Sequence, residues 1–323
     1  MKKVFLIILN WNGGGMTVNC LHSLKSIKTD GMDIEIVVVD NGSTDNSLKL
    51  IEHFKLEIKK SHLKLRILRN KINLGFAEGN NVGIRYALKN GADYILILNN
   101  DTTVDKDLLV QLIKQASLDN RIGILGPKIY FAPGYEYHKE RYKLNERGKV
   151  FWYAGGLIDW NNVYCSHRRV DEVDKGQYDK VEETDFVSGC AMLVKKEVFE
   201  KIGLFDPRYF LYLEDADFCH RAKKAGFKVV YTPPGKVWHY NASSSEVGGP
   251  LHDYFFTRNR MLFGTKYAPL KSKLALLKES VKLLLVGRRW QKLGIRDFYF
   301  GVVGEITRDK FAYLKKFGKG SWK

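Results

Sequence analysis

Short, mostly apolar segments alternate along the first 130 residues with segments whose apolar residues recur every three or four positions. The mostly apolar segments are Val4–Leu9, Ile34–Val39, Leu63–Leu68 and Tyr94–Leu98. The segments with the helical period are Thr17–Ile27, Ser47–Phe54, Gly79–Lys89 and Leu108–Ser117. Strands buried on both faces that alternate with helices predict an α/β fold with a mostly parallel, Rossmann-like sheet flanked by helices.

The pattern changes after residue 130. Residues 131–180 are polar, aromatic and mixed in charge, which predicts long loops or a hairpin, with a weak strand at Val150–Tyr153. Regular elements then return. In chain order, the sequence predicts a strand at Phe186–Val194, helices at Lys196–Ile202 and Glu214–Ala225, and a short strand at Lys228–Tyr231. We expect this last strand to end before Pro233-Pro234, and the chain from Leu270 onward to be a basic helical tail.

The composition is that of a globular protein. The chain has 323 residues, of which 45% are hydrophobic and 28% charged, so it is not mainly disordered. No apolar run approaches the roughly 18–20 residues of a membrane span, and the first apolar run lacks a cleavage site, so we expect no signal peptide. The four cysteines are scattered, which predicts reduced thiols in a cytoplasmic protein.

The net charge of +17 is distributed unevenly. The segment from Arg260 to Lys323 contains 16 Lys or Arg residues and only four acidic residues. A basic end of this kind predicts an anionic partner, which could be a phosphate group, a nucleic acid or a membrane surface.

Three of the predicted strands end in polar clusters. These are Asn10-Trp11-Asn12, Asp40-Asn41-Gly42-Ser43 and Asn99-Asn100-Asp101. Each alone has the composition of an ordinary turn. The carboxyl ends of parallel strands share one edge of a sheet, where ligands of such folds bind, so together the clusters predict a polar ligand site. Gly13-Gly14-Gly15 matches neither a dinucleotide-binding nor a P-loop motif.

Four further features have both a functional and a structural explanation. Asp101 suits Mg²⁺, which takes one or two carboxylates and completes its shell with phosphate oxygens and water, but it also suits a turn. The acids of Glu214-Asp215-Ala216-Asp217 can supply a general base or complement a helix N-terminus. His239 directly follows a strand, where it can be a ligand or a structural residue. Arg258 lies on an expected helix, where it can clamp phosphate or face solvent.

Taken in order and spacing, these segments resemble family 2 glycosyltransferases of the GT-A fold, in the rhamnosyltransferase-like branch. The resemblance extends from about residue 3 to residue 265. The stretches that carry it are Ile8–Gly13, Val38–Asp45, Asn73–Asn81, Leu98–Thr102, Phe186–Ala191, Tyr212–Asp217 and Trp238-His239. One departure is that Asn99-Asn100-Asp101 stands where many relatives have Asp-X-Asp, which leaves the affinity and identity of a metal open.

The resemblance implies roles for particular residues. It implies that the nucleotide sugar contacts Asn10, Asn12, Asp40, Asn73, Asn100, Asp101 and Arg258. It implies that Asp101 and His239 hold a divalent metal, Mg²⁺ or Mn²⁺, and that Asp215, with Glu214 beside it, is the catalytic base. Gly189 and Cys190 are implied on the acceptor side. Because Asp215 begins a helix, we expect its pKa not to be strongly raised.

The implied activity is a metal-dependent, inverting hexosyl transfer in cell-envelope polysaccharide or glycoconjugate synthesis. The donor is a nucleotide diphosphate sugar, with dTDP-rhamnose favoured and a UDP-sugar also compatible, and the acceptor is a glycan or lipid-linked hydroxyl. Residues 1–265 form the catalytic domain, with a nucleotide-binding half (1–130) and an acceptor-side half (131–265), and residues 266–323 a basic extension. The alternatives are a nucleotidyltransferase and a non-catalytic protein that binds an anionic polymer; we expect no nucleic-acid partner.

The tail has an amphipathic pattern. Its apolar residues recur at helical spacing, with lysines between them, at Leu270, Leu274, Leu277, Val281 and Leu284. Such a helix can lie in the interface of an anionic membrane, which would place the enzyme at the inner face of the cell membrane. Alternatively, it packs on the catalytic domain with its lysines in water.

Overall fold

A computed structural model describes residues 1–58, 63–240, 248–302 and 304 of the chain. Its strands are β1 (Lys2–Asn10), β2 (Met32–Asp40), β3 (Lys64–Arg69), β4 (Tyr94–Asn99), β5 (Thr102–Val104), β6 (Ile122–Phe131), β7 (Phe151–Tyr153), β8 (Gly156–Asp159), β9 (Tyr164–His167), β10 (Glu182–Glu183), β11 (Ala191–Lys195) and β12 (Lys228–His239). Its helices are α1 (Gly14–Leu24), α2 (Ser47–Glu57), α3 (Gly75–Lys89), α4 (Leu108–Ala116), α5 (Lys196–Ile202), α6 (Glu214–Lys224), α7 (Pro250–Tyr267), α8 (Leu270–Val286) and α9 (Arg289–Tyr299), besides a 3₁₀ turn at Lys139–Arg141.

One large sheet organises the fold, in the order β10-β12-β6-β11-β4-β1-β2-β3, with β5 beside β12 and β7 beside β6. The pairs β4–β1, β1–β2, β2–β3 and β6–β12 are parallel, whereas β11 runs antiparallel between β4 and β6. The expected α/β architecture with a mostly parallel central sheet is therefore confirmed. The hairpin expected within 131–180 is β8–β9, a separate two-stranded sheet.

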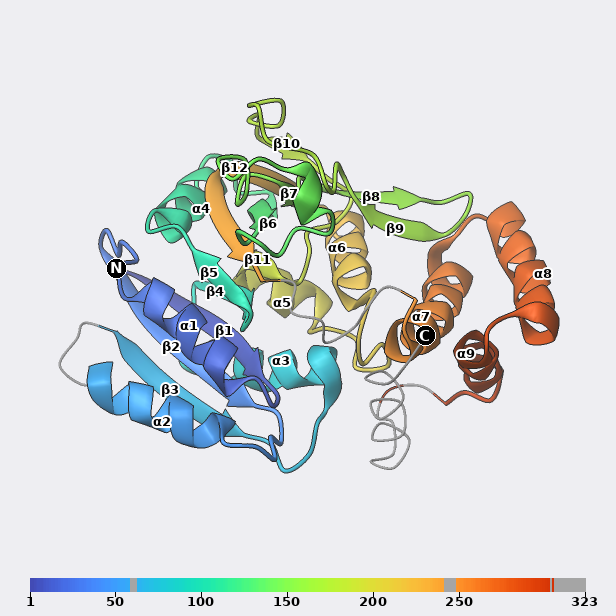
Figure 1. Cartoon of the computed structure of the whole chain (residues 1–323), viewed down its shortest axis with the longest axis horizontal. Helices are drawn as coiled ribbons and strands as arrows, with labels where there is room; N and C mark the ends of the chain where they lie inside the picture. The colour runs from blue at the N-terminus through green and yellow to red at the C-terminus, as the bar shows by residue number, and fades with distance from the viewer. Residues whose placement is uncertain (59–62, 241–247, 303, 305–323) are drawn as a thin grey trace.

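Helices cover both faces of this sheet because successive residues of each strand point to opposite sides. Along β1, Val4, Leu6 and Ile8 share one buried cluster with residues of α1, α2 and α4. Phe5 and Ile7 point the other way, into a cluster with α3, α5 and α6. Figure 1 shows α1 and α2 in front of β1–β3, with the three C-terminal helices α7–α9 grouped at the opposite end of the molecule.

Two predicted strands had wrong bounds. The strand expected at Lys228–Tyr231 continues through both prolines to His239 as β12. Its pairing with β6 shifts from Thr232 opposite Pro127 to Lys236 opposite Lys128, so residues 233–235 form a bulge. Both prolines lie in this bulge, where the ladder does not need the N–H group that proline lacks. The strand expected at Phe186–Val194 begins only at Ala191.

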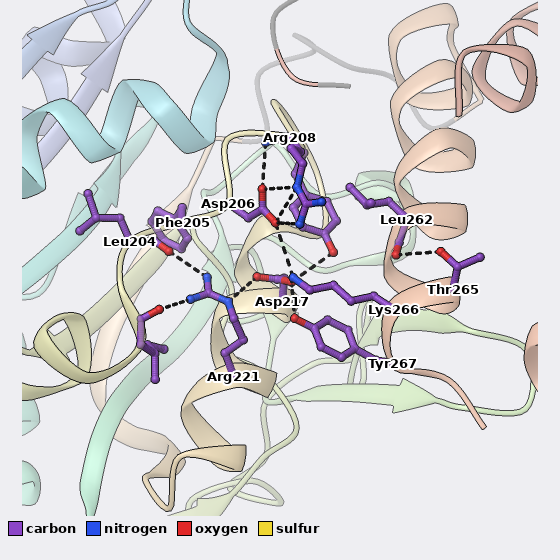
Figure 2. A network of polar contacts seen from close by, with 12 residues as sticks. Leu204, Phe205, Asp206, Arg208, Asp217, Arg221, Leu262, Thr265, Lys266 and Tyr267 are labelled. Atoms are coloured by element: carbon purple, nitrogen blue, oxygen red, sulfur yellow. Dashed lines mark hydrogen bonds and ion pairs between the residues drawn. The ribbon is translucent and has the colours of Figure 1, made fainter. Parts of the chain in front are cut away.

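A buried carboxylate joins α6 to the C-terminal end of α7. Asp217 on α6 is fully buried and accepts hydrogen bonds from Arg221 Nε at 2.7 Å, Lys266 Nζ at 2.8 Å and Tyr267 Oη at 2.7 Å (Figure 2). Lys266 and Tyr267 end α7, so this one side chain fixes α7 against α6. Buried charges need such partners, because an unpaired charge is costly to remove from water.

The basic extension packs on α7. Tyr254 Oη of α7 donates a 2.6 Å hydrogen bond to Asp297 of α9, and Arg260 pairs with Glu279 of α8 at 2.8 Å through both guanidinium NH groups. Within the described ranges, no helix combines the length and hydropathy needed to cross a bilayer. The division of the chain near residue 265 stays a prediction, and residues 305–323 of the predicted tail lie outside the described residues.

We expect Asp217→Ala to lower the free energy of unfolding by about 3–5 kcal/mol, the usual cost of removing one partner of a buried ion pair. Urea unfolding measures this. The matched control is Asp33→Ala, which removes a surface pair with Lys64, whose side chain is 62% exposed, and costs about 1 kcal/mol or less. Equal losses in the two variants would contradict the role given to Asp217.

Candidate functional site

The carboxyl ends of β1, β2 and β4 meet at one edge of the sheet. Asn10 lies opposite Asp40, and Leu9 lies opposite Asn99. Asn10 is fully buried; its Nδ2 donates to Asp40 Oδ1 at 2.9 Å, and its Oδ1 accepts from Thr17 Oγ1 at 2.7 Å. The polar clusters that follow these strands are thus part of one hydrogen-bonded assembly.

Asp40 is held from two sides. Besides the bond from Asn10, its Oδ2 accepts the backbone N–H of Ser43 at 3.2 Å. The Ser43 hydroxyl in turn accepts the backbone N–H of Asn12 at 3.0 Å, and Asn12 Oδ1 accepts the N–H of Thr44 at 2.8 Å. These bonds lock the two loops together and fix the orientation of the Asp40 carboxylate, whose residue is 4% exposed.

Asn73 closes the turn that leads into α3. Its Oδ1 accepts the N–H of Gly75 at 2.8 Å and Nδ2 of Asn41 at 2.8 Å. Asn41, which sequence reasoning did not assign, is 1% exposed and also accepts from Asn70 and from the N–H of Leu74. Its position directly after Asp40 was the available signal, because a buried asparagine beside a strand end commonly binds neighbouring backbone.

Asn100 joins the same assembly through Thr17. Asn100 Nδ2 donates to Thr17 Oγ1 at 3.0 Å, and Thr17 donates to Asn10. Thr17 lies on α1 and sequence reasoning missed it, since a threonine within a helical period carries no local signal. Asp40, Asn10, Thr17 and Asn100 therefore form one continuous chain of polar side chains.

Asp101 and His239 face each other across the β5–β12 pair. His239 lies opposite Thr102 in the ladder, and the Asp101 carbonyl accepts the N–H of Tyr240 at 2.9 Å. His239 Nε2 lies 3.2 Å from Asp101 Oδ1, a distance for an ion pair without hydrogen-bond geometry. Burial acts to raise the pKa of Asp101, but the neighbouring His239 and a backbone hydrogen bond together lower it by more, and the pKa lies below its usual value.

This pair fits one side of a divalent metal site. Asp101 Oδ1 and His239 Nδ1 are buried and have no hydrogen-bond partner among the described residues. A carboxylate oxygen and an imidazole nitrogen are both metal ligands. In the described part of the chain, no group of three His, Cys, Asp or Glu side chains could hold a metal. A bound ion would therefore take its other ligands from a substrate and water, as Mg²⁺ usually does.

Glu214 and Asp215 occupy the N-terminus of α6. Asp215 is partly exposed and accepts the N–H of Gly189 at 3.0 Å on Oδ2 and of Ala216 at 2.8 Å on Oδ1. Burial raises the pKa of Asp215 in spite of these bonds, an upward direction that the helix N-terminus alone does not give. Glu214 is 5% exposed, and burial first, then the Asp215 charge, raises its pKa well above the ordinary value.

Gly189 and Cys190 connect Asp215 to the sheet edge. Gly189 donates its N–H to Asp215, and the Cys190 carbonyl accepts the N–H of Asn99 at 2.9 Å. A Cβ on Gly189 would lie 3.0 Å from the ring of Phe76 and 3.7 Å from Cβ of Asp215, so the space suits glycine. The Cys190 side chain is buried, and burial raises the pKa of its thiol well above the usual value.

Arg258 contacts the loop that precedes α6. Its residue is fully buried, and its Nη2 donates to the carbonyls of Arg208 at 3.0 Å and Tyr209 at 2.8 Å. These carbonyls belong to the loop before α6. Arg258 thus holds that loop through two hydrogen bonds. The contact of Arg258 with a nucleotide sugar stays a prediction.

Asn259, another residue that sequence reasoning missed, binds the same loop. Its Nδ2 lies 2.7–2.8 Å from the carbonyls of Tyr209, Leu211 and Tyr212. The loop contains Phe210, Tyr212 and Leu213 at φ of 64°, 71° and 68°, which non-glycine residues rarely adopt. Buried amide contacts of this kind hold the strained turn that presents Glu214 and Asp215.

Comparison with known sequences finds one family and several enzymes that resemble this chain. The sequence model of glycosyl transferase family 2 matches residues 5–203. The N-acetylglucosaminyl-diphospho-decaprenol L-rhamnosyltransferase of Mycobacterium tuberculosis is 27% identical over 66% of this chain and 68% of its own length. The dTDP-rhamnosyl transferase RfbF of Shigella flexneri is 25% identical over 98% of this chain and 93% of its own length.

The fold also resembles solved structures. The crystal structure of GalNAc-T7 with UDP, GalNAc and Mn²⁺ matches with a TM-score of 0.58 and 17% identity over 94% of this chain. This chain spans 57% of the length of that structure. At this identity the likeness concerns the fold alone, and it confirms the expected GT-A architecture.

We expect the free energy of unfolding of Glu214→Gln, relative to that of wild type, to increase with pH. A carboxyl whose pKa is higher in the folded than in the unfolded chain holds its proton more tightly when folded, so the free energy of unfolding falls as pH rises above the unfolded value. Glutamine cannot lose a proton. Urea unfolding at about pH 5 and about pH 8 should show the variant gaining on wild type at the higher pH.

The matched control is Glu57→Gln on the surface of α2, where Glu57 pairs with Lys25 at 3.5 Å. It should show no such gain. If the free energies of unfolding of Glu214→Gln and wild type differ by the same amount at both pH values, burial does not raise the pKa of Glu214.

Proposed function

This chain belongs to glycosyl transferase family 2, and we propose that it transfers a sugar, with inversion, from a pyrimidine nucleotide diphosphate sugar to an acceptor hydroxyl. One observation carries the proposal. Backbone contacts through Asn99, Cys190 and Gly189 link the sheet edge that holds Asp101 and His239 to the carboxylate of Asp215. A group that binds a leaving diphosphate and a base for an acceptor would thus lie on one rigid frame.

Asp40 would bind the base of the nucleotide. A carboxylate fixed by Asn10 and Ser43 can accept the imide N–H that uracil and thymine share, so it would not separate the two bases. The two relatives named above are both rhamnosyltransferases, and the printed name of one includes dTDP. We therefore favour dTDP-rhamnose as the donor, with a UDP-sugar as the second candidate.

Asp101 and His239 would hold a divalent metal against the diphosphate. When bound, the ion neutralises the charge that develops on the leaving group. The solved relative with Mn²⁺ supports a metal of this type in the fold. Asn100, tied to Thr17, would face the ribose, and Asn73 would shape the wall of the pocket.

Asp215 would be the catalytic base. The acceptor oxygen forms a bond to the anomeric carbon while the bond from that carbon to the diphosphate oxygen breaks, and the hydroxyl proton passes to Asp215. The nucleotide diphosphate leaves with the bonding electrons. Asp215 is the more exposed carboxylate of the pair, and its raised pKa favours proton uptake. Glu214, whose pKa burial raises well above its usual value, lies beside it.

The acceptor would be a glycan or a lipid-linked saccharide. The printed name of the mycobacterial relative describes a diphospho-decaprenol acceptor, which supports the lipid-linked class. The family match favours neither of the alternatives considered from the sequence, a nucleotidyltransferase or a polymer-binding protein.

We expect Asp215→Asn to lower turnover by about 10²–10⁴-fold, the contribution of general base catalysis, with donor binding retained. Transfer assays with dTDP-rhamnose and UDP-sugars measure turnover, and calorimetry with the nucleotide diphosphate measures binding. The matched control is Asp33→Asn, at the opposite end of β2, which should leave both unchanged. If Asp215→Asn keeps full turnover, Asp215 is not the catalytic base.

Nucleotide binding tests the metal residues separately. At about 100 times its dissociation constant, dTDP or UDP with Mn²⁺ should raise the melting temperature by roughly 5 °C, since such saturation adds about 2.7 kcal/mol. Asp101→Asn should abolish the part of the shift that needs metal, while Asp33→Asn keeps it. An equal shift in Asp101→Asn, or larger shifts with GDP or ADP, would count against this site.

A further inference from the structure

Helix α8 exposes large apolar side chains, although Leu276, Leu277 and Leu283 pack on the protein. The exposed fractions are 72% for Leu270, 59% for Leu274, 55% for Val281, 37% for Leu284 and 72% for Leu285. At about 100° of rotation per residue, these five positions fall within an arc of about 100°. We refer to them as the outward face of α8.

The opposite side of α8 is the one that packs. Its buried residues are Ser272, Leu276 and Ser280, and Ser280 Oγ lies 2.6 Å from the hydroxyl of Tyr299 on α9. An amphipathic helix in a soluble protein normally buries its large apolar stripe. Here Leu270, Leu274, Val281 and Leu284 of the stripe read from the sequence are exposed, and only Leu277 is half-buried against the core. Two of the three fully buried residues of α8 are serines.

Lysines border the outward face. Lys271, Lys278 and Lys282 lie on one flank and are exposed. Glu279 is the acidic residue of α8, and its carboxylate is paired with Arg260 of α7 at 2.8 Å, on the side toward the protein. The outward face and its rim therefore present apolar and positive groups together.

We propose that the outward face of α8 docks in the interface of an anionic membrane. Large aliphatic side chains reach the boundary between head groups and acyl chains, while flanking lysines stay at the level of anionic head groups. Charge complementarity selects this occupant. A second copy of the chain would bring two lysine rims, in a protein of net charge +17, against each other.

The position of α8 allows such docking. Figure 1 shows α8 at the outer end of the molecule, on the far side of α7 and α9 from the sheet. A membrane in contact with this face would leave the sheet edge outside the lipid. The inference is independent of the proposed transfer reaction, since vesicle binding is measured without donor or acceptor.

Flotation of the full chain with vesicles tests the proposal. Wild type should float with phosphatidylcholine vesicles that contain about 30% phosphatidylglycerol, and much less with phosphatidylcholine alone. The double variant Leu274→Glu/Val281→Glu should bind the anionic vesicles about tenfold or more weakly. Lys278→Gln/Lys282→Gln should bind weakly and with less dependence on salt.

The matched control is Leu56→Glu/Leu118→Glu, two leucines that are 69% and 70% exposed on other elements. It should bind like wild type. Undiminished binding by the α8 double variant, or equal binding of wild type to neutral and anionic vesicles, would overturn the proposal. So would sedimentation velocity showing that the α8 variant loses self-association while it still binds vesicles.

Circular dichroism melts compare the folding of all variants. If Leu274→Glu/Val281→Glu does not fold, Leu274→Ser/Val281→Ser removes the same apolar contact without adding charge. Binding like that of wild type by this folded variant would equally overturn the proposal.

Discussion

The parallel pairing of β1 with both β2 and β4 is the constraint on which the site depends. It places Asn10 opposite Asp40 and Leu9 opposite Asn99, so the chain leaves the sheet three times at one edge. A shift of one residue in this register would exchange the two faces of a strand and bury different side chains. The strands are apolar on both faces, and helices on both sides hold the register firmly.

The carboxylates of Glu214 and Asp215 are positioned differently, by a strained loop that α7 holds. Left-handed residues cost roughly 1–3 kcal/mol each and persist only where surroundings compensate. Here Asn259 binds three carbonyls of the loop, and the Phe210 carbonyl accepts the N–H of Phe76 at the start of α3. The loop is therefore anchored both to α3 and to α7. Asp297 of α9 binds Tyr254 of α7, so α9 in turn contacts the helix that holds this loop.

Local signals were sufficient for much of the fold. The four N-terminal strands follow from their apolar runs, and α6 ends where Gly226, at φ of 90°, follows its basic last turn. The placement of His239 beside Asp101 has no such signal, because it depends on β12 continuing past two prolines and pairing with β5. The family resemblance predicted that His239 acts together with Asp101, whereas the pattern of residues around His239 did not. For Arg258, an aromatic and arginine-rich segment does not reveal whether the guanidinium meets phosphate or backbone carbonyls.

Helix α8 shows a second limit of sequence reasoning. Periodicity identified its large apolar stripe but not the direction in which the stripe faces. On the packed side of α8, the side chain of Leu276 lies against Gly264 of α7, where an added Cβ would lie 2.4 Å from it. The other fully buried residues of α8 are Ser272 and Ser280, and Ser280 contacts Tyr299 of α9. The fully buried positions of α8 thus take one leucine and two serines, and the exposed side chains of Leu270, Leu274, Val281 and Leu285 remain available to a partner outside the chain.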